Sequence, residues 1–360
     1  MDGQDGRAFG FHGTWRDYAP IAFTNLLLTI VTLGIYRFWA TTRTRRYLWS
    51  RTRFIDEPLE WGGTGLELLI GFLLVILLFA VPLLFLQFGM QAMIFQGYVG
   101  EAMSLAALAF AMIFYLGGVA RFRMLRYRLS RTWWHGIRGG ADDKGWGYGW
   151  SYCWRYALAT MAISLPIPWA MTSLWNQRWA AMSFGPFAFE SDARAGPLFG
   201  RFLLFYLLPI VFVVLGFGLL RMVAGDGALL LARPGEAPDP RLLFLFALFA
   251  LLIYGSLGVV ALIYYAKFFR VAIGGMALST LDFRFDARSR DWLRLILGDI
   301  ALVVLTLGIG LIFLSYRHWK FFVTHLDATG EIHLSELTQS TTRAPGQGEG
   351  LADAFDIGAI

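Results

Sequence analysis

The chain has 360 residues, of which 57% are hydrophobic and only 16% are charged, and its net charge is +6. These proportions exclude a pair of ordinary soluble domains, because soluble domains carry about 25% charged residues. The single cysteine, Cys153, excludes an intrachain disulfide and a cysteine-based metal cage. Composition therefore predicts a membrane protein.

The first ten residues lack a basic segment followed by an apolar one, so we expect no cleaved signal peptide. Residues 9–13 alternate apolar and small side chains, which predicts a short strand before the first apolar element. A basic segment with interleaved aromatic residues follows at 43–51, and it suits a helix at the level of the lipid headgroups. Two short strands within 51–63 then predict a β-hairpin.

Apolar stretches long enough to cross about 30 Å of hydrocarbon recur along the chain. Four of them are uninterrupted and predict transmembrane helices near residues 68–88, 102–120, 202–220 and 242–266. Three weaker stretches, near 18–36, 156–175 and 300–316, contain glycine or proline residues that interrupt them. The candidate helix breaks are Gly34, Pro166, Pro168 and Gly308.

The sequence around the first weak stretch returns later in the chain. Residues 9–43 align without a gap with residues 283–317, so that Phe9 matches Phe283. The basic segment also returns at an offset of 80 positions. The six matching positions are Arg43, Arg46, Tyr47, Ser50, Arg51 and Thr52 with Arg123, Arg126, Tyr127, Ser130, Arg131 and Thr132. We therefore expect internal repeats, with repeated elements near residues 9–54, 150–190 and 283–325.

These elements define a repeated polytopic membrane domain over residues 1–336 and a polar, disordered tail over residues 337–360. The predicted fold class is an all-α membrane protein, a polytopic helical bundle with internal repeats and small β-hairpins on the cytoplasmic face. The hairpins are expected because short strand patterns follow the basic segments.

Charge distribution leaves two topologies open. The loop at 87–101 has no Lys or Arg, whereas the segments after the first and third apolar stretches are rich in arginine and are expected to be cytoplasmic. Seven ordinary crossings would place some basic segments on opposite faces. If the three interrupted stretches instead enter and leave on the same side as re-entrant or interfacial hairpins, every strongly basic segment is cytoplasmic.

The chain resembles the bacterial YjgN family of multi-pass membrane proteins. The resemblance covers residues 9–336 and departs at Phe38, where the family usually has proline. It implies an inner-membrane protein and no known reaction. The segments that carry it are residues 25–29 (Asn-Leu-Leu-Leu-Thr), 32–36 (Thr-Leu-Gly-Ile-Tyr), 38–39 (Phe-Trp), 46–47 (Arg-Tyr), 127–132 (Tyr-Arg-Leu-Ser-Arg-Thr) and 136–139 (Gly-Ile-Arg-Gly).

Tyrosine and arginine residues at the ends of the apolar stretches are candidate contacts for lipid or another anion. One interpretation makes them topology determinants that only anchor the chain to anionic headgroups. The other makes them a selective site for an anionic lipid or a phosphate-bearing solute, which requires converging guanidinium groups. The candidates are Arg43, Arg46, Tyr47, Arg51, Arg123, Arg126, Tyr127 and Arg131.

Two polar residues lie inside apolar stretches at equivalent positions of the repeat, Asn25 and Asp299. Such residues are costly in a membrane unless they are buried or paired. They either cap or tie a helix near its entrance, or, for Asp299, form part of a cation or proton pathway.

No phosphate-binding glycine loop, zinc-protease motif or supported catalytic triad is present in the sequence. The five histidines are scattered, so no metal site is expected, and Asp142 and Asp143 suit a solvated loop. We expect no enzyme, no catalytic residue and no cofactor. The expected partner is the lipid bilayer with its anionic headgroups, and nucleic acid is not expected.

The leading functional hypothesis is transport or binding of a small solute or lipid, since repeats and interrupted helices are common where membrane proteins bind substrates. This hypothesis is an analogy at the level of the fold. The alternative is a non-transporting membrane scaffold or envelope-integrity protein, which would share the repeats but lack a polar cavity. The expected location is the bacterial inner membrane.

Overall fold

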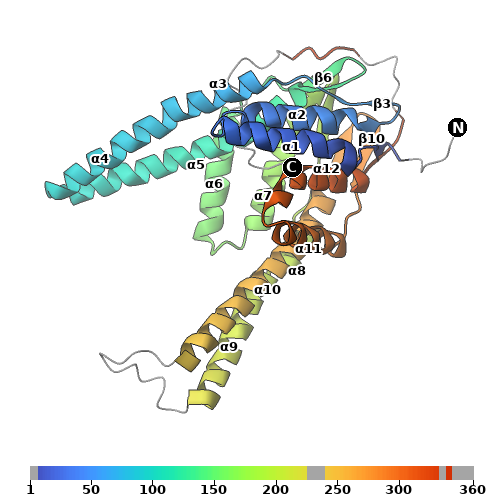
Figure 1. Cartoon of the computed structure of the whole chain (residues 1–360). Coiled ribbons are helices and arrows are strands. Elements are labelled where there is room, and N and C mark those ends of the chain that lie inside the picture. The colour runs from blue at the N-terminus through green and yellow to red at the C-terminus, as the bar shows by residue number, and fades with distance from the viewer. Residues whose placement is uncertain (1–6, 225–239, 332–337, 343–360) are drawn as a thin grey trace.

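The computed structural model describes residues 7–224, 240–331 and 338–342. Two kinds of helical hairpin alternate along this chain, three short and two long (Figure 1). The short ones pair α1 (Trp15–Val31) with α2 (Arg37–Ser50), α6 (Trp146–Met161) with α7 (Ile167–Ala180), and α11 (Ser289–Leu305) with the 3-10 segment η2 (Ile309–Phe313) and α12 (Leu314–His325).

The two long hairpins extend away from the rest of the molecule in different directions, one to the left and one downward in Figure 1. The first pairs α3 (Gly65–Val75), the π-helical segment η1 (Ile76–Ala80) and α4 (Val81–Phe95) with α5 (Val99–Ser130). The second pairs α8 (Gly196–Phe202) and α9 (Leu204–Ala224) with α10 (Pro240–Ile273).

Helices long and apolar enough to cross a membrane occur at Val99–Ser130, Gly196–Leu219 and Phe246–Ile273. Only 6% of the most apolar window is buried in each of the last two, so almost all of that apolar surface faces outward, as lipid-facing helices require. The predicted spans near 102–120, 202–220 and 242–266 fall largely in these helices. The stretch near 68–88 is divided by η1 into two shorter apolar helices.

A tight reversal joins the two helices of each short hairpin. Each reversal contains two consecutive residues in the left-handed conformation. They are Leu33 and Gly34 in the first hairpin, Ile163 and Ser164 in the second, and Leu307 and Gly308 in the third. The amide of the second residue donates to a carbonyl five positions earlier, at 2.7 Å, 2.7 Å and 2.8 Å respectively, which satisfies the end of the first helix. Each interrupted stretch is thus a helix that ends and turns back.

Two threonines build the first and third reversals in the same way. The hydroxyl of Thr32 donates to the Leu28 carbonyl at 2.7 Å and accepts the Tyr36 amide at 2.9 Å. Thr306 does the same with Leu302 and Gly310 at 2.6 Å and 2.7 Å. In the second hairpin the left-handed residues precede the prolines, so Pro166 caps α7 and Pro168 lies in its first turn, where proline is favourable.

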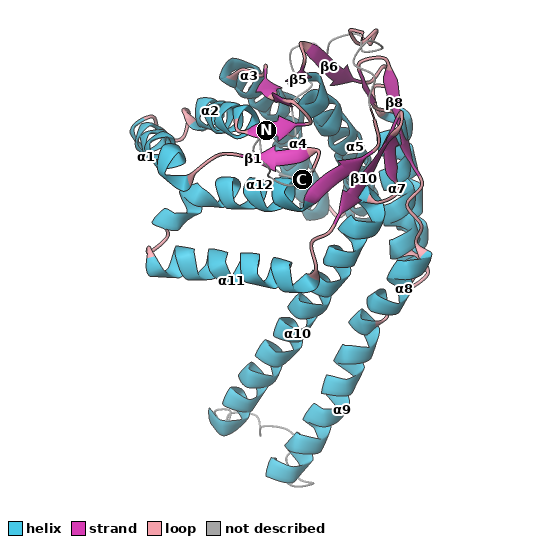
Figure 2. Ribbon diagram, turned by 90° about the vertical axis from the view of Figure 1, so that its right-hand side faces the viewer, coloured by secondary structure: helices cyan, strands magenta, loops and turns pink. Residues whose placement is uncertain are grey.

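The expectation of an all-α fold with small β-hairpins is confirmed only in part, because the chain is mostly helical but the strands between the helices join into sheets (Figure 2). One antiparallel sheet has eight strands, in the order β11-β10-β9-β8-β7-β6-β5-β4. They are β4 (Glu60–Trp61), β5 (Thr132–Trp134), β6 (Ile137–Gly140), β7 (Ser183–Phe184), β8 (Phe187–Ser191), β9 (Met276–Leu278), β10 (Leu281–Phe285) and β11 (Leu326–Thr329).

A second antiparallel sheet of three strands consists of β1 (Phe9–Phe11), β2 (Thr52–Phe54) and β3 (Glu57–Pro58). It lies beside β11, because the Ala8 amide donates to the Asp327 carboxylate at 3.0 Å. The sequence could predict single hairpins but not that they join into one sheet, since pairs such as Gly139 with Phe184 connect strands from distant segments. Strands of two to five residues carry too little pattern to specify such partners.

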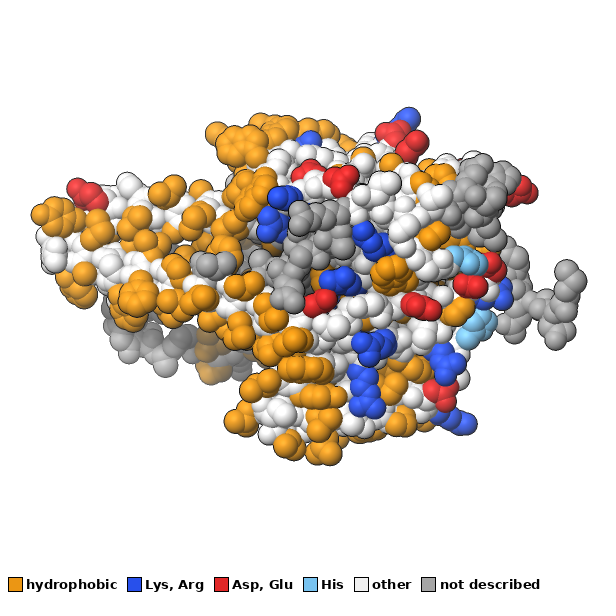
Figure 3. Space-filling model, turned by 90° about the horizontal axis from the view of Figure 1, so that it is seen from above, with side chains coloured by type: hydrophobic (Ala, Val, Ile, Leu, Met, Phe, Trp, Pro, Cys, Tyr) orange, Lys and Arg blue, Asp and Glu red, His pale blue; other side chains and the backbone are white. Residues whose placement is uncertain are grey.

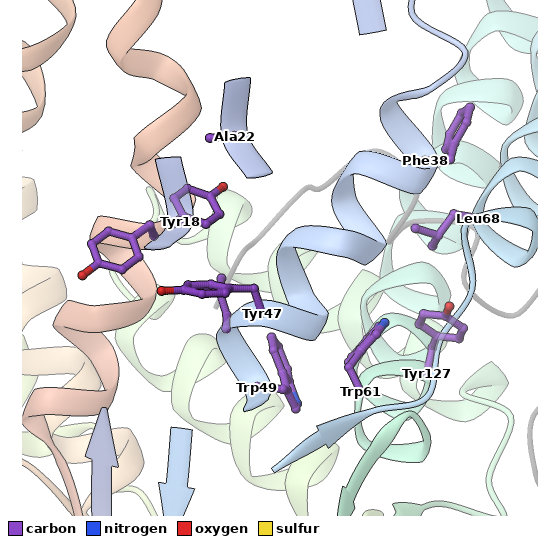
Figure 4. Close-up of a cluster of buried hydrophobic side chains, with 10 residues drawn as sticks. Tyr18, Ala22, Phe38, Tyr47, Trp49, Trp61, Leu68 and Tyr127 are labelled. Atoms are coloured by element: carbon purple, nitrogen blue, oxygen red, sulfur yellow. The ribbon is translucent and has the colours of Figure 1, made fainter. Parts of the chain in front are cut away.

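Aromatic side chains fill the core beneath the first short hairpin (Figure 4). Tyr18 stacks on Tyr316 with ring centroids 5.5 Å apart, and Trp49 stacks on Trp319 at 4.0 Å. The Tyr47 hydroxyl donates to the Thr14 carbonyl at 2.9 Å, which ties the end of α2 to the start of α1. The entrance and exit of this hairpin therefore lie side by side.

Most of the expected tail at 337–360 lies outside the described residues. Its described part, residues 338–342, contacts β6, and the side chain of Gln339 accepts the Arg138 amide at 3.3 Å. The side-chain amide of Gln339 also donates to the Gly136 carbonyl at 2.9 Å, so these residues lie against the sheet.

Candidate functional site

A cavity of about 570 Å³ lies between the first and third short hairpins. Its walls come from α1, α2, η2 and α12, with contributions from the end of α5 and from α7. The polar lining includes Asn25, Thr44 and His318, whereas most of the remaining wall is leucine, isoleucine, phenylalanine and tryptophan. This volume is within the usual range of about 300–1,000 Å³ for sites that bind small molecules.

A second cavity of about 200 Å³ adjoins the first. The two cavities share part of their lining, and we call them the paired cavities. The smaller one lies between α5, α7, α12 and strands β9 and β10. The shared residues are Leu125, Arg128, Trp179, Phe322 and Leu326.

Five arginines line the paired cavities, and no Asp or Glu is among the described lining residues. Arg37 and Arg45 line the larger cavity, Arg121 and Arg178 the smaller one, and Arg128 both. Positive side chains between apolar walls favour an anionic ligand, because low polarity strengthens their interaction with charge.

Arg178 is placed by a simple helical spacing. Trp175, Arg178 and Trp179 are three and four positions apart on α7, so they share one face and all line the smaller cavity. The Arg178 guanidinium lies 5.3 Å from the centre of the Trp175 ring. Its Nε atom is buried and has no hydrogen-bond acceptor within the described part of the chain.

Burial lowers the pKa of the Arg178 guanidinium, and the positive charges of Arg121 and Arg128 lower this pKa further, although Tyr148 opposes them. Arg178 makes no ion pair with any acidic residue that the structure describes. Taking a cation out of water costs free energy. A bound anion would offset this cost.

One polar residue ties the two helices of each short hairpin together. Asn25 donates to the Ala40 carbonyl at 3.2 Å and to the Thr44 hydroxyl at 3.4 Å. Asp299 accepts Arg317 Nε at 2.5 Å and contacts His318 Nε2 at 2.7 Å.

The middle hairpin has an equivalent tie, from Arg155 to the Gln177 side chain at 2.5 Å. Asn25, Arg155 and Asp299 each lie eight positions before the first left-handed residue, from 25 to 33, 155 to 163 and 299 to 307. The structure thus places Asn25 and Asp299 as ties between helices. Arg155 was not among the residues expected from the sequence, although this spacing identifies it.

The tyrosine and arginine candidates lie apart from the paired cavities, since none of them is a lining residue. Arg43, Arg46 and Arg51 are exposed, and Tyr47 is buried in the aromatic core. The Arg123 guanidinium lies 4.6 Å from the centre of the Trp146 ring.

The remaining three candidates lie near the end of α5. Arg131 contacts both carboxylate oxygens of Glu67 at 2.8 Å and 3.2 Å, and the Tyr127 hydroxyl donates to the same carboxylate at 3.1 Å. Arg126 is buried. Glu67 therefore ties α3 to α5, a role that the sequence analysis did not identify.

Charged side chains are unevenly distributed on the surface. Seen from above, hydrophobic side chains cover the arm formed by α3, α4 and α5, whereas Lys, Arg, Asp and Glu gather over the body of the molecule (Figure 3). Within residues 7–224, 240–331 and 338–342, no group of three or more His, Cys, Asp or Glu could hold a metal ion. The paired cavities are thus the best candidate for a binding site.

A protein-family model described as "Bacterial protein of unknown function (DUF898)" matches residues 7–354. The inner membrane protein YjgN of Salmonella typhimurium is 31% identical over 130 residues, which are 36% of this chain and 30% of that protein. The YjgN protein of Escherichia coli K12 is 43% identical over 58 residues, 16% of this chain and 15% of that protein. The chain therefore spans less than a third of the length of these curated relatives.

No solved structure gives a significant match. The names of the relatives, together with the three candidate membrane helices, place the chain in the inner membrane. This location confirms the expectation from composition and from the resemblance. Since the family match extends over nearly the whole chain, the protein belongs to the bacterial DUF898 family, whose function is unknown and which includes the YjgN proteins that its sequence resembles.

Proposed function

We propose that the protein binds a small solute or lipid in the paired cavities and holds or moves it within the inner membrane. One observation carries this proposal: cavities lined by five arginines and by no described acidic residue lie among the short hairpins. A scaffold needs no such space. The proposal involves no chemical reaction and no cofactor.

The proposed membrane arrangement follows from the reversals in the short hairpins. The two long hairpins would cross the bilayer, and the three short ones would enter and leave it on the cytoplasmic side. Each reversal returns the chain to the end where it began, so all strands and arginine-rich segments would gather on one face. This arrangement agrees with a positive-inside orientation, and the bilayer with its anionic lipids would be the immediate partner.

The proposal is tested by filling the larger cavity. Ser315 is exposed and lines this cavity, so Ser315→Trp would occupy space without disturbing a packed core. Ser104 is equally exposed but lies on α5 outside the lining, and Ser104→Trp is the matched control. Native mass spectrometry of the full chain in a neutral detergent would compare the bound small molecules.

We expect Ser315→Trp to reduce the ligand retained from the membrane by about tenfold or more, as a steric block in a pocket does. Ser104→Trp should retain as much ligand as the wild-type protein. Equal retention by all three proteins would contradict binding in the cavity and would favour the scaffold alternative.

A further inference from the structure

The side chain of Gln339 makes a two-point contact with the backbone at β6, 203 positions earlier in the chain. Its carboxamide oxygen accepts the Arg138 amide at 3.3 Å, and its nitrogen donates to the Gly136 carbonyl at 2.9 Å. A carboxamide is both a donor and an acceptor, so it satisfies both backbone groups as a paired strand would. A carboxylate in its place has no donor for the carbonyl.

Two glycines leave the space that the ends of the segment at 338–342 occupy. A Cβ added at Gly140 would overlap the Thr342 hydroxyl, and one added at Gly185 would lie 2.9 Å from the Thr338 carbonyl oxygen. Gly140 ends β6, whereas Gly185 lies in the turn between β7 and β8. Two separate parts of the sheet therefore admit this segment because they lack side chains at the points of contact.

The segment is also held by polar contacts of its own. The Ser340 amide donates to the Gln339 side-chain oxygen at 3.1 Å, and the hydroxyls of Ser340 and Thr342 hydrogen-bond to each other at 2.7 Å. Ser340 and Thr342 are each only 8% exposed. The Arg138 guanidinium donates to the Thr342 carbonyl, which gives it an acceptor where burial, and then the charge of Arg131, lower its pKa.

We propose that β6 and the turn between β7 and β8 form a peptide-binding site that selects a glutamine side chain. Residues 338–342 are its ligand within the chain, and the same peptide supplied from outside takes their place. The class of ligand is a short polar segment whose glutamine carboxamide pairs with the backbone of Gly136 and Arg138. This inference goes beyond the proposed function, since none of these residues lines the paired cavities.

The test measures amide hydrogen exchange of residues 137–140 by mass spectrometry, with the full chain in a neutral detergent. Exchange reports whether the site is occupied, because the Gln339 side chain accepts the Arg138 amide. Gln339→Glu replaces the donor by a carboxylate, and Thr341→Glu adds the same charge at an exposed position of the same segment as the matched control. Gly140→Val keeps Gln339 but fills the space of Thr342.

We expect exchange to be about tenfold faster or more in Gln339→Glu and Gly140→Val than in the wild-type protein and Thr341→Glu. The probe is the peptide acetyl-Thr-Gln-Ser-Thr-Thr-amide at about 10 mM, above the millimolar effective concentration of a tethered segment. It should restore slow exchange in Gln339→Glu but not in Gly140→Val, where the site itself is blocked. The same peptide with Glu in place of Gln should restore it in neither variant.

Three results would overturn the inference. One is unchanged exchange in Gln339→Glu, and another is equal restoration by the two peptides, which would mean that the carboxamide is not selected. The third is no restoration by the glutamine peptide, which would make the contact ordinary packing within the chain. A thermal melt checks that each variant folds, and Gln339→Leu, which removes the amide without adding charge, replaces Gln339→Glu if that variant does not.

Discussion

The first and last short hairpins have nearly the same backbone but hold it with different chemistry. Their reversals share a threonine, two left-handed residues and a glycine at φ 91° and 92°. At the matched position, however, a neutral Asn25 faces a carbonyl and a hydroxyl, whereas Asp299 faces Arg317 and His318. The same architecture therefore tolerates either an amide or an ionic tie, provided that the facing helix supplies the complementary groups.

The largest effect is expected from moving the charge to the first hairpin. In Asn25→Asp, a carboxylate would replace an amide that is 6% exposed and would face the Ala40 carbonyl, which can only repel it. We expect a loss of about 3 kcal/mol at pH 7, since an uncompensated buried charge costs this much. Thermal unfolding in detergent would measure it.

The cost of Asn25→Asp should depend on pH in a defined direction. Burial raises the pKa of a carboxyl group above about 3.9, its unfolded value, so the folded state favours the protonated form. The destabilisation should be small near pH 4 and should grow as the pH rises, whereas Asn25→Ala should show no such trend. A pH-independent loss would mean that water or a cation reaches this position.

The second effect is expected from removing the charge of the last hairpin. Asp299→Asn would leave Arg317 and His318 without their carboxylate. The Asp299 side chain is 14% exposed but its partners are 33% and 37% exposed, so solvent reduces the loss to about 2 kcal/mol. Asp282→Asn, an exposed residue of β10, is the control and should leave the unfolding temperature unchanged.

The outcome of Asp299→Asn also separates the two roles considered for this residue. A structural tie predicts a change in stability that His318→Gln partly reproduces. A proton pathway would instead predict a change in transport with stability unchanged. A variant with both properties unaltered would show that neither role is needed.

Much of this comparison could be predicted from the sequence, and the reason is that it is local. The glycines, the threonines and the equivalence of Asn25 and Asp299 all lie within one helical hairpin, where spacing along the chain determines proximity. The long apolar stretches could also be predicted, because a helix that crosses the hydrocarbon layer must have a minimum length. The internal repeat itself stays a prediction from sequence.

The sheet and the paired cavities could not be predicted because they depend on distant segments. Nothing near Gly139 indicates that its strand pairs with the strand of Phe184. Arg178 and Arg43 look alike in sequence, since both are basic residues beside aromatic ones at the end of an apolar stretch. Only the tertiary arrangement places Arg178 beside a cavity, while Arg43 remains exposed. The candidate anion contacts from the sequence lie outside the lining of the paired cavities, and their role stays a prediction.

A smaller effect tests whether the two reversals are truly equivalent. Gly34 and Gly308 adopt left-handed conformations, and an added Cβ would meet no atom within 4 Å at either one. Their substitution by alanine should therefore cost only backbone strain, about 1 kcal/mol in each case. Thermal unfolding should give nearly equal losses for Gly34→Ala and Gly308→Ala.

The control for the reversals is Gly89→Ala in the interior of α4, where an added Cβ also meets nothing. This glycine has no positive φ, so alanine should stabilise its helix slightly through its higher helix propensity. Unequal losses at Gly34 and Gly308 would show that the surroundings, and not the backbone alone, determine one of the two turns.

The smallest effect is expected where the amide tie is removed without adding charge. Asn25→Leu loses two hydrogen bonds, but it also removes the Asn25 Oδ1 atom, which is buried without a partner within the described chain. The Thr44 hydroxyl keeps its contact with the Tyr18 hydroxyl at 3.4 Å. Replacing a partly satisfied polar group by an apolar one of similar size is nearly neutral, so we expect a change within about 0.5 kcal/mol.

The same substitution in the last hairpin should behave differently. Asp299→Leu would leave the Arg317 guanidinium beside an apolar side chain, and we expect it to cost at least as much as Asp299→Asn, about 2 kcal/mol. The difference between the two leucine variants, measured by thermal unfolding under one set of conditions, gives the energetic contrast between the ties directly. If both variants are equally stable, the ion pair at Asp299 contributes no more than the amide at Asn25, and its charge must be retained for another purpose, such as the His318 side chain that lines the larger cavity.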